Sequence, residues 1–291
     1  MSYLHTIIFG VLALISYGLS DSWISIVSRK VGAVRTTFWR NIFASSGLFL
    51  ILVAYLFLFP HSIEISFKYI LLALAVSFIG YLSVLSFYSA LANGKLGIVS
   101  PISNSSILFT AALSVVLFKE SLSWFQVFAI IILFIGIITT TINFRDFNKS
   151  ELIESKQAVT LSFLTCILWA ILFFLLKINV QYLGPILSAF IIEFGAVIYS
   201  ASHMHIRGLS FQIDRRTLFF SFLAGILGAL GLLFYNIGII GGYVSIVASI
   251  TFSAPLISVL YGRIFYNEYL SFQQYIGVFL ILAGIIILAS F

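Results

Sequence analysis

Charged side chains are scarce in this sequence. They make up 8% of the 291 residues, with 15 basic and 9 acidic side chains, whereas hydrophobic residues make up 62%. The mean hydropathy is +1.17. A typical soluble domain carries about 25% charged residues, so this composition excludes that class. The sequence is instead typical of an all-α membrane protein that crosses the bilayer several times.

Cysteines and catalytic motifs are also nearly absent. The single cysteine, Cys166, can form no internal disulfide. No GxxxxGK[ST] phosphate loop is present, which argues against ATP hydrolysis by this chain. His203 and His205 supply only half of a metal site, and we interpret them as part of a solvated loop. We therefore predict no enzyme activity, no cofactor and no metal.

Ten apolar segments are long enough to cross a bilayer as helices, which requires about 20 residues each. They divide five and five around the longest polar stretch, residues 145–156. We expect a first repeat over residues 1–143, a polar linker over 144–157 and a second repeat over 158–291. The ten helices are predicted near residues 5–28, 35–60, 67–92, 97–118, 124–143, 158–181, 184–203, 217–240, 244–266 and 271–290.

The two halves are related in sequence. When the chain is shifted by 148 positions, residues 87–138 align with residues 235–286 without a gap, and 13 of the 52 positions are identical. Because five is an odd number of crossings, the second half must enter the membrane inverted relative to the first. The predicted fold is therefore ten transmembrane helices in two inverted five-helix repeats. This architecture is typical of transporters that bind substrate where the halves meet.

Four charged residues lie within the predicted spans, where charge is costly and normally faces a cavity or a partner. Asp21 is a candidate for binding a cationic substrate or a coupling proton. Glu193 is a candidate charge sensor or proton carrier, with a buried pair with Lys177 as the alternative. Lys177 itself could receive a substrate carboxylate. Arg40, near the start of its helix, is interpreted as structural, with its side chain reaching the membrane interface.

Polar and aromatic side chains supply the other candidates. The fourth predicted helix of each half is interrupted, over residues 100–106 and 248–255, by hydroxyl residues and a proline. Matching interruptions point to a transport site, with close packing of small residues as the alternative. The predicted substrate-binding residues are Tyr17, Asp21, Tyr88, Ser103, Asn104, Trp169, Lys177, Glu193, Tyr235, Asn236 and Thr251.

Several of these features together resemble the drug/metabolite transporter superfamily, in particular its ten-helix EamA-type members. They are the two five-helix halves, an aromatic residue midway along the first helix of each half (Tyr17, Trp169), Arg40 near the start of the second helix, and Glu-x-Leu-Ser turns at Glu120 and Glu268. We interpret the two glutamates as structural caps. The resemblance covers nearly the whole chain and implies a central cavity and export or exchange of small metabolites.

Membrane orientation is open at this point. Basic residues concentrate in alternate connections, at residues 29–35, 145–156 and 207–216. The positive-inside rule places these connections in the cytoplasm and both termini outside. The resemblance implies the opposite orientation, with both termini in the cytoplasm.

We therefore expect a multi-pass protein of the cytoplasmic (inner) membrane that acts as a secondary transporter. Its substrate would be a small polar or amphipathic metabolite, with an amino acid or related compound favoured because both signs of charge occur in the spans. The alternatives are a nutrient importer of the same fold, of the choline or S-adenosylmethionine type, and a scaffold or receptor without transport activity. Expected partners are the lipid bilayer, the substrate, and protons or a counter-substrate, without nucleic acid. The chain would act as a monomer or homodimer.

Overall fold

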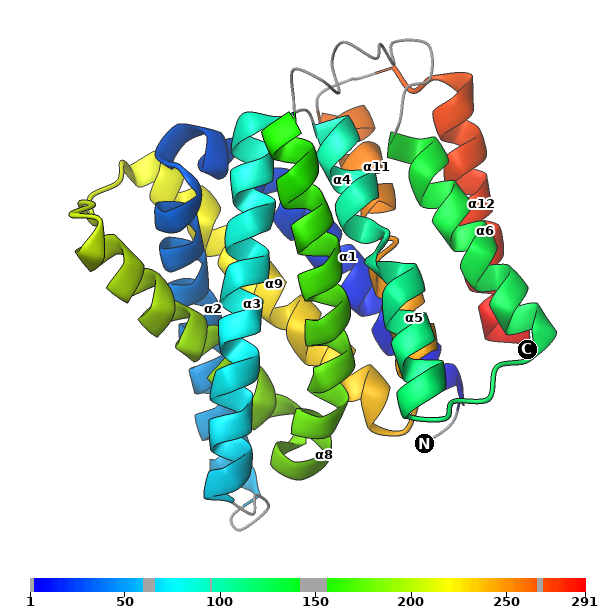
Figure 1. Ribbon diagram of the computed structural model, residues 1–291, viewed down its shortest axis with the longest axis horizontal. Helices are drawn as coiled ribbons and strands as arrows, with labels where there is room; N and C mark the ends of the chain where they lie inside the picture. The colour runs from blue at the N-terminus through cyan, green and yellow to red at the C-terminus, as the bar shows by residue number, and fades with distance from the viewer. Residues whose placement is uncertain (1–2, 60–65, 95, 142–155, 266–268) are drawn as a thin grey trace.

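The computed structural model of the chain describes residues 3–59, 66–94, 96–141, 156–265 and 269–291. All regular elements in these ranges are helices (Figure 1). Those before residue 142 are α1 (Tyr3–Val31), α2 (Ala33–Leu58), α3 (Phe67–Asn93), α4 (Leu96–Asn104), α5 (Ser106–Leu117) and α6 (Trp124–Thr141). Those after residue 155 are α8 (Lys156–Ile206), α9 (Arg215–Ile240), α10 (Val244–Thr251), α11 (Pro255–Phe265) and α12 (Phe272–Ser290).

The long element α8 is two membrane-crossing helices. Its 51 residues would extend for about 75 Å if they were straight, more than twice the thickness of a bilayer core. The chain reverses at Gly184, where φ is 72°, and Pro185 follows directly. The described ranges hold nine apolar segments that could each cross a membrane, by length and composition. Because α8 accounts for two crossings, the described ranges hold ten, and the predicted all-α membrane fold is confirmed.

The fourth crossing of each half is broken, as the sequence predicts. In the first half, α4 ends at Asn104 and α5 begins at Ser106. In the second half, α10 ends at Thr251 and α11 begins at Pro255, a residue that cannot donate a backbone hydrogen bond. Asn104 and Thr251 both line the cavity described below.

Identical residues of the repeat shape α6 and α12 in the same way. Ser271 and Gln274 form a capping box at the start of α12. Ser123 and Gln126 make the same two hydrogen bonds before α6, at 2.9 and 3.2 Å. The two helices pack side by side at one edge of the molecule (Figure 1). Gly136 allows this approach, because a Cβ there would lie only 2.8 Å from a side-chain carbon of α12.

The remaining helices form a bundle with two chemically distinct ends. In this bundle α3 packs on α8, α1 packs on α9, and α2 packs on both α8 and α9. The end of the molecule that we name the basic side carries the end of α1, the start of α2 and the connection from α8 to α9 (Figure 1). The basic residues in or next to these three segments are Arg29, Lys30, Arg35, Arg207, Arg215 and Arg216. The opposite end, the termini side, holds both chain ends together, since the Tyr3 hydroxyl donates to the Leu288 carbonyl at 2.6 Å.

An ion pair on the basic side links α1 to α9. The Lys30 ammonium lies 2.8 Å from the carboxylate of Asp214. Asp214 is the N-cap of α9 and accepts hydrogen bonds from the backbone and the hydroxyl of Thr217. The Lys30 ammonium, followed by the Thr217 hydroxyl, lowers the pKa of the Asp214 carboxyl below its usual value.

His203 and His205 lie in the last turn of α8, so their interpretation as a solvated loop was wrong. The helix continues to Ile206, past the predicted end. Nδ1 of His203 lies 2.5 Å from the hydroxyl oxygen of Tyr81 on α3. Within the described ranges, no three His, Cys, Asp or Glu side chains are grouped to hold a metal ion.

Candidate functional site

A cavity with an empty volume of about 810 Å³ lies between the helices of the two halves. It is bounded by α1 to α4 from the first half and by α8 to α10 from the second, together with the break before α11. It is displaced toward the basic side, because Asp21 lies nearer to the end of α1 than to its start and Tyr88 lies close to the end of α3. Its polar lining residues are Tyr17, Ser20, Asp21, Arg40, Asn41, Tyr88, Asn104, Glu193 and Thr251.

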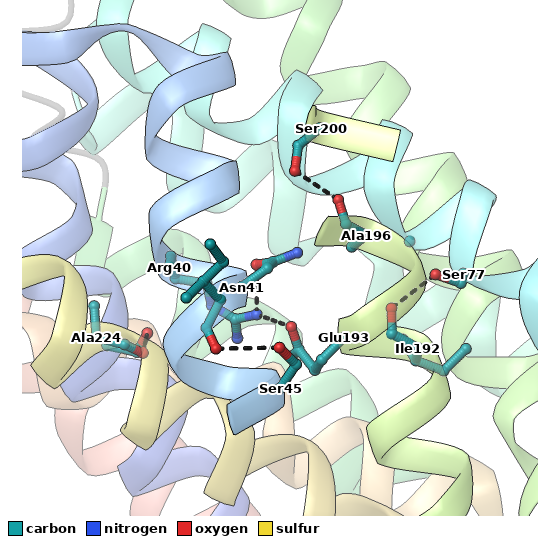
Figure 2. Close-up of polar contacts among 12 residues, drawn as sticks. Arg40, Asn41, Ser45, Ser77, Ile192, Glu193, Ala196, Ser200 and Ala224 are labelled. Carbon is teal, nitrogen blue, oxygen red and sulfur yellow. Dashed lines mark hydrogen bonds and ion pairs between the residues drawn. The ribbon is translucent and has the colours of Figure 1, made fainter. Parts of the chain in front are cut away.

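Arg40 and Glu193 form a buried ion pair in the cavity wall (Figure 2). Their side chains are 7% and 6% exposed. Nη1 of Arg40 also donates to Oδ1 of Asn41 at 2.9 Å. Helix α9 makes room for the guanidinium at Gly228, where a Cβ would lie 2.7 Å from Cζ of Arg40. Three helices, α2, α8 and α9, therefore fix the position of this pair.

A row of glycines on α9 carries the polar wall of the cavity. Gly228 faces the Arg40 side chain, and Gly225, one turn earlier, meets its backbone. Gly231, one turn later, lies under the ring of Tyr17, whose carbons would be 3.0 Å from a Cβ. Because the three glycines recur at every third position, they lie along one side of α9. Arg40 and Tyr17 pack against this side.

Asp21 differs from the other two charged residues of the cavity. Its carboxylate makes no hydrogen bond and no ion pair with any residue that the structure describes. The cavity thus contains two carboxylates and one guanidinium, and the guanidinium is already paired with Glu193. When all three groups are ionised, the cavity has a net charge of one negative unit, located at Asp21.

Aromatic rings form a continuous wall beside Asp21. Phe87 and Trp169 have ring centroids 4.8 Å apart, and Trp169 lies 6.1 Å from Phe252. Phe252 in turn lies 4.8 Å from Phe173, which lies 6.2 Å from Tyr17. All five rings line the cavity. The faces and edges of such rings can hold an apolar body, and their faces also attract cations.

The structure brings together most of the residues that the sequence singles out. Seven of the eleven line the cavity: Tyr17, Asp21, Tyr88, Asn104, Trp169, Glu193 and Thr251. The predicted role of these residues in substrate binding remains a prediction. Four residues do not line the cavity: Ser103, Lys177, Tyr235 and Asn236.

The alternative pairing of Lys177 with Glu193 was wrong, whereas the contact of Lys177 with a substrate carboxylate remains a prediction. The Lys177 ammonium donates to the backbone carbonyls of Ile239 and Gly242, at 2.5 and 2.7 Å, around the turn from α9 to α10. Arg40 instead is the partner of Glu193. The expectation that Arg40 reaches the membrane interface was therefore also wrong, because its guanidinium turns inward to a buried carboxylate.

The other three residues outside the cavity are buried in the bundle. The Tyr235 hydroxyl donates to the Phe173 carbonyl at 2.9 Å. Nδ2 of Asn236 donates to the Pro185 carbonyl at 3.1 Å. Ser103 is fully buried, and its hydroxyl has no partner in the described ranges. These residues therefore shape the scaffold around the cavity.

Sequence reasoning missed Arg40 and Phe87 as cavity residues. Phe87 was not distinguishable in a chain with 31 phenylalanines. The glycine row on α9 is a signal that could have identified Arg40, since glycines at every third position of a membrane helix mark a close approach by a neighbour.

Glu120 acts as the predicted cap, although it caps a helix of the other half. Its carboxylate accepts hydrogen bonds from the backbone N–H groups of Val244 and Ser245, at 2.7 and 3.0 Å. The Ser245 hydroxyl donates to it at 2.6 Å. A carboxylate at this position stabilises the N-terminus of α10. Its repeat partner Glu268 lies outside the described residues.

Comparison with known proteins agrees with this architecture. The model of the EamA-like transporter family matches residues 4–142 and again residues 156–290. No curated protein matches the chain. A solved structure titled "Crystal structure of protein" has a TM-score of 0.77, with 15% sequence identity over 97% of this chain and 95% of its own, which shows a shared fold. The two family matches cover nearly all of the sequence and confirm the resemblance, so this membrane protein belongs to the EamA-like transporter family.

Proposed function

We propose that this membrane transporter is a secondary transporter that moves a small amphipathic organic cation by alternating access. The two halves, residues 1–143 and 158–291, would move about the cavity between them. The observation that carries this proposal is the Asp21 carboxylate, which lines the cavity without a partner among the described residues.

The charge balance of the cavity favours a cation over a zwitterion. An amino acid could place its ammonium group at Asp21, but its carboxylate would meet a guanidinium that Glu193 already neutralises. The other basic candidate, Lys177, is bound to carbonyl groups outside the cavity. A cationic group at Asp21 instead neutralises a carboxylate that has no partner among the described residues, and no existing ion pair has to break.

The shape of the cavity supports the amphipathic part of the proposal. Its lining combines the charged and polar groups around Asp21 with a wall of aromatic rings, as is usual for small-molecule sites. The wall formed by Trp169, Phe173 and Phe252 offers ring surface to an apolar body, and Trp169 can also attract the cation through its face. Asp21 then fixes the charged end of the molecule.

The charge distribution supports a proposal for membrane orientation. The basic residues at the end of α1, the start of α2 and the connection from α8 to α9 lie at one end of the bundle, and the chain termini lie at the other. We propose that the basic side faces the cytoplasm of a cell with this protein in its cytoplasmic membrane. The cavity, displaced toward this side, would then be the cytoplasmic-facing site. A reporter fused to the C-terminus, active only outside the cell, tests this orientation.

Transport by purified protein in liposomes tests the proposed substrate class. The panel contains labelled quaternary amines, primary amines, amino acids, nucleosides and S-adenosylmethionine, each with and without a pH gradient. We expect the amines to be transported and the Asp21→Asn variant to lose at least tenfold in binding, because it lacks the charge. A pH gradient should drive the movement, since a carboxylate can hold either a proton or the substrate cation.

Asp214→Asn is the matched control, because it makes the same chemical change at an exposed acid of the basic side. This control should transport like the wild-type protein. Thermal unfolding of both variants verifies that they are folded. Amine transport by folded Asp21→Asn at the wild-type rate would refute the role of Asp21, and transport of amino acids alone would refute the substrate class.

A further inference from the structure

One buried face of the broken fourth crossing carries hydroxyl groups that have no hydrogen-bond partner. Ser103 near the end of α4, and Ser106 and Thr110 on α5, are fully buried. Within the described part of the chain, none of the three hydroxyl oxygens has a partner. Steps of three and four residues place them on one side of the helix. The helices that pack most closely on α5 are α8 and α10.

Several other buried serines are satisfied by their own helix, whereas Ser188 on α8 also lacks a partner among the described residues. Ser162, Ser221 and Ser249 donate to the carbonyl four residues earlier, at 2.7, 2.9 and 2.6 Å. A buried hydroxyl without such a bond has lost its hydrogen bonds to water without a replacement, which is unfavourable. A row of three on one face therefore indicates a surface that is dry in this conformation and meets water in another.

The row begins at the cavity. Asn104, next to Ser103, lines the cavity, and so does Thr251 of α10. Thr251 is the residue equivalent to Ser103 in the 148-residue repeat, and its hydroxyl also lacks a partner among the described residues. From this point the row follows α5 toward the termini side, where Glu120 lies just beyond the end of the helix.

An aromatic contact lies beneath the cavity. The rings of Phe173 and Tyr235 meet edge to face with centroids 4.7 Å apart, and the Tyr235 hydroxyl holds the Phe173 carbonyl at 2.9 Å. Phe173 lines the cavity, whereas Tyr235 is fully buried and lies outside it. This contact separates the cavity from the termini side.

Two opposite charges clamp the turn between α9 and α10. Lys177 binds the carbonyls of Ile239 and Gly242 on one side of the turn. Glu120 binds the N–H groups of Val244 and Ser245 on the other. The equivalent of Lys177 in the first half is Ser25, which cannot supply this charge. The clamp is therefore a feature of the termini side that the repeat does not reproduce.

We propose that the hydroxyl face of Ser103, Ser106 and Thr110 is the wall of a second access path, which joins the cavity to the termini side. In this conformation the path is closed by the Phe173–Tyr235 contact and by the Lys177–Glu120 clamp. When the clamp releases, α5 and α10 separate and water reaches the three hydroxyls. The inference rests on the alternating access of the proposed function, but it does not depend on the identity of the substrate.

Cysteine accessibility tests the path directly. Cys166, the only cysteine of the chain, is first replaced by alanine. Ser106→Cys and Thr110→Cys are then made separately and exposed to a charged methanethiosulfonate in lipid nanodiscs, because a thiol reacts readily only where water reaches it. We expect both to react at least tenfold faster than Ile107→Cys, a fully buried apolar neighbour on the same helix. Adding Lys177→Met should increase both rates severalfold.

The outcomes separate this proposal from the proposed substrate. Reaction rates equal to that of Ile107→Cys, with and without Lys177→Met, would overturn the path even if amines are transported. If both cysteines react fast and Lys177→Met leaves their rates unchanged, water reaches them from the cavity. That result would overturn the path as well. If amine transport fails while Lys177→Met accelerates labelling, the path stands and the substrate proposal fails.

A second variant avoids dependence on the introduced thiols. Thr110→Val removes an unpartnered hydroxyl with little change in shape. It should stabilise the closed conformation, so the melting temperature should rise while the turnover of any transported substrate falls. A raised melting temperature with unchanged turnover would contradict the path.

Discussion

The Arg40–Glu193 pair can be tested by adding one methyl group on a neighbouring helix. In Gly228→Ala, the new Cβ would lie 2.7 Å from Cζ of Arg40. This is well below the separation of about 3.5–4.0 Å at which carbon atoms pack. The contact lies at the guanidinium carbon, so the charged group has to move away from α9. We expect this movement to separate Arg40 from Glu193.

The expected magnitude is the difference between two opposing terms. Replacing glycine by alanine inside a helix stabilises it by about 1 kcal/mol. Breaking a buried ion pair, which leaves an uncompensated charge, costs about 3–5 kcal/mol. The free energy of unfolding of Gly228→Ala should therefore fall by about 2–4 kcal/mol relative to the wild-type protein. A displaced Arg40 would also turn toward Asp21, so binding of an organic cation should weaken.

Gly80→Ala is the matched control. Gly80 also lines the cavity, but its Cβ would meet a methyl carbon of Leu172 at 3.6 Å, an ordinary contact. Its stability should be unchanged or higher by up to about 1 kcal/mol. Both variants are compared by chemical unfolding in the same detergent and by cation binding. If Gly228→Ala matches Gly80→Ala in both measurements, the proposed dependence of the site on α9 is refuted.

Three further perturbations have defined outcomes. Glu120→Gln should lower the free energy of unfolding by about 1–3 kcal/mol, because its hydrogen bonds to Val244 and Ser245 lose their charge; equal stability by chemical unfolding would contradict the cap. Gly184→Ala should cost about 1–2 kcal/mol from backbone strain alone, since φ is 72° and no atom lies within 4 Å of the added Cβ; Gly184→Asn should cost less in the same assay. The pKa of Asp214 is lowered in the folded state, so its stabilising contribution is present above about pH 4 and is lost as the pH falls through the folded-state pKa. The difference in melting temperature between wild type and Asp214→Asn that is present at pH 7 should therefore shrink as the pH falls below about 4.

The fold was predictable because it depends on local and repeated signals. Long apolar runs require helices in a bilayer whatever their partners are, and the break before Pro255 follows from a missing backbone donor. The capping serines Ser123 and Ser271 act within three residues of their own position. The reversal at Gly184 falls at the predicted start of the helix over residues 184–203.

The charged partners were not predictable for a physical reason. Position along a helix gives the depth of a residue but not the direction in which its side chain turns. Arg40 and Lys177 each lie near a helix end, where a long side chain can reach water, a carbonyl group or a carboxylate. Arg40 turns to Glu193 because Gly228 on another helix leaves space. Lys177 turns to Ile239 and Gly242 because a helix ends there.

Several residues that are identical in the two halves belong to the scaffold, whereas two of the pairs that differ line the cavity. Identical glycines and capping residues, such as Gly136 and Gln126, hold helices together outside the cavity. Pairs that differ include Asp21, which aligns with Phe173, and all four residues of the Asp21/Phe173 and Asn104/Phe252 pairs line the cavity. Two inverted repeats can thus share the same helix packing while each contributes different side chains to a single site. In these two pairs a phenylalanine accompanies the polar residue, which adds to the amphipathic lining of the cavity and supports an organic cation over a fully polar solute.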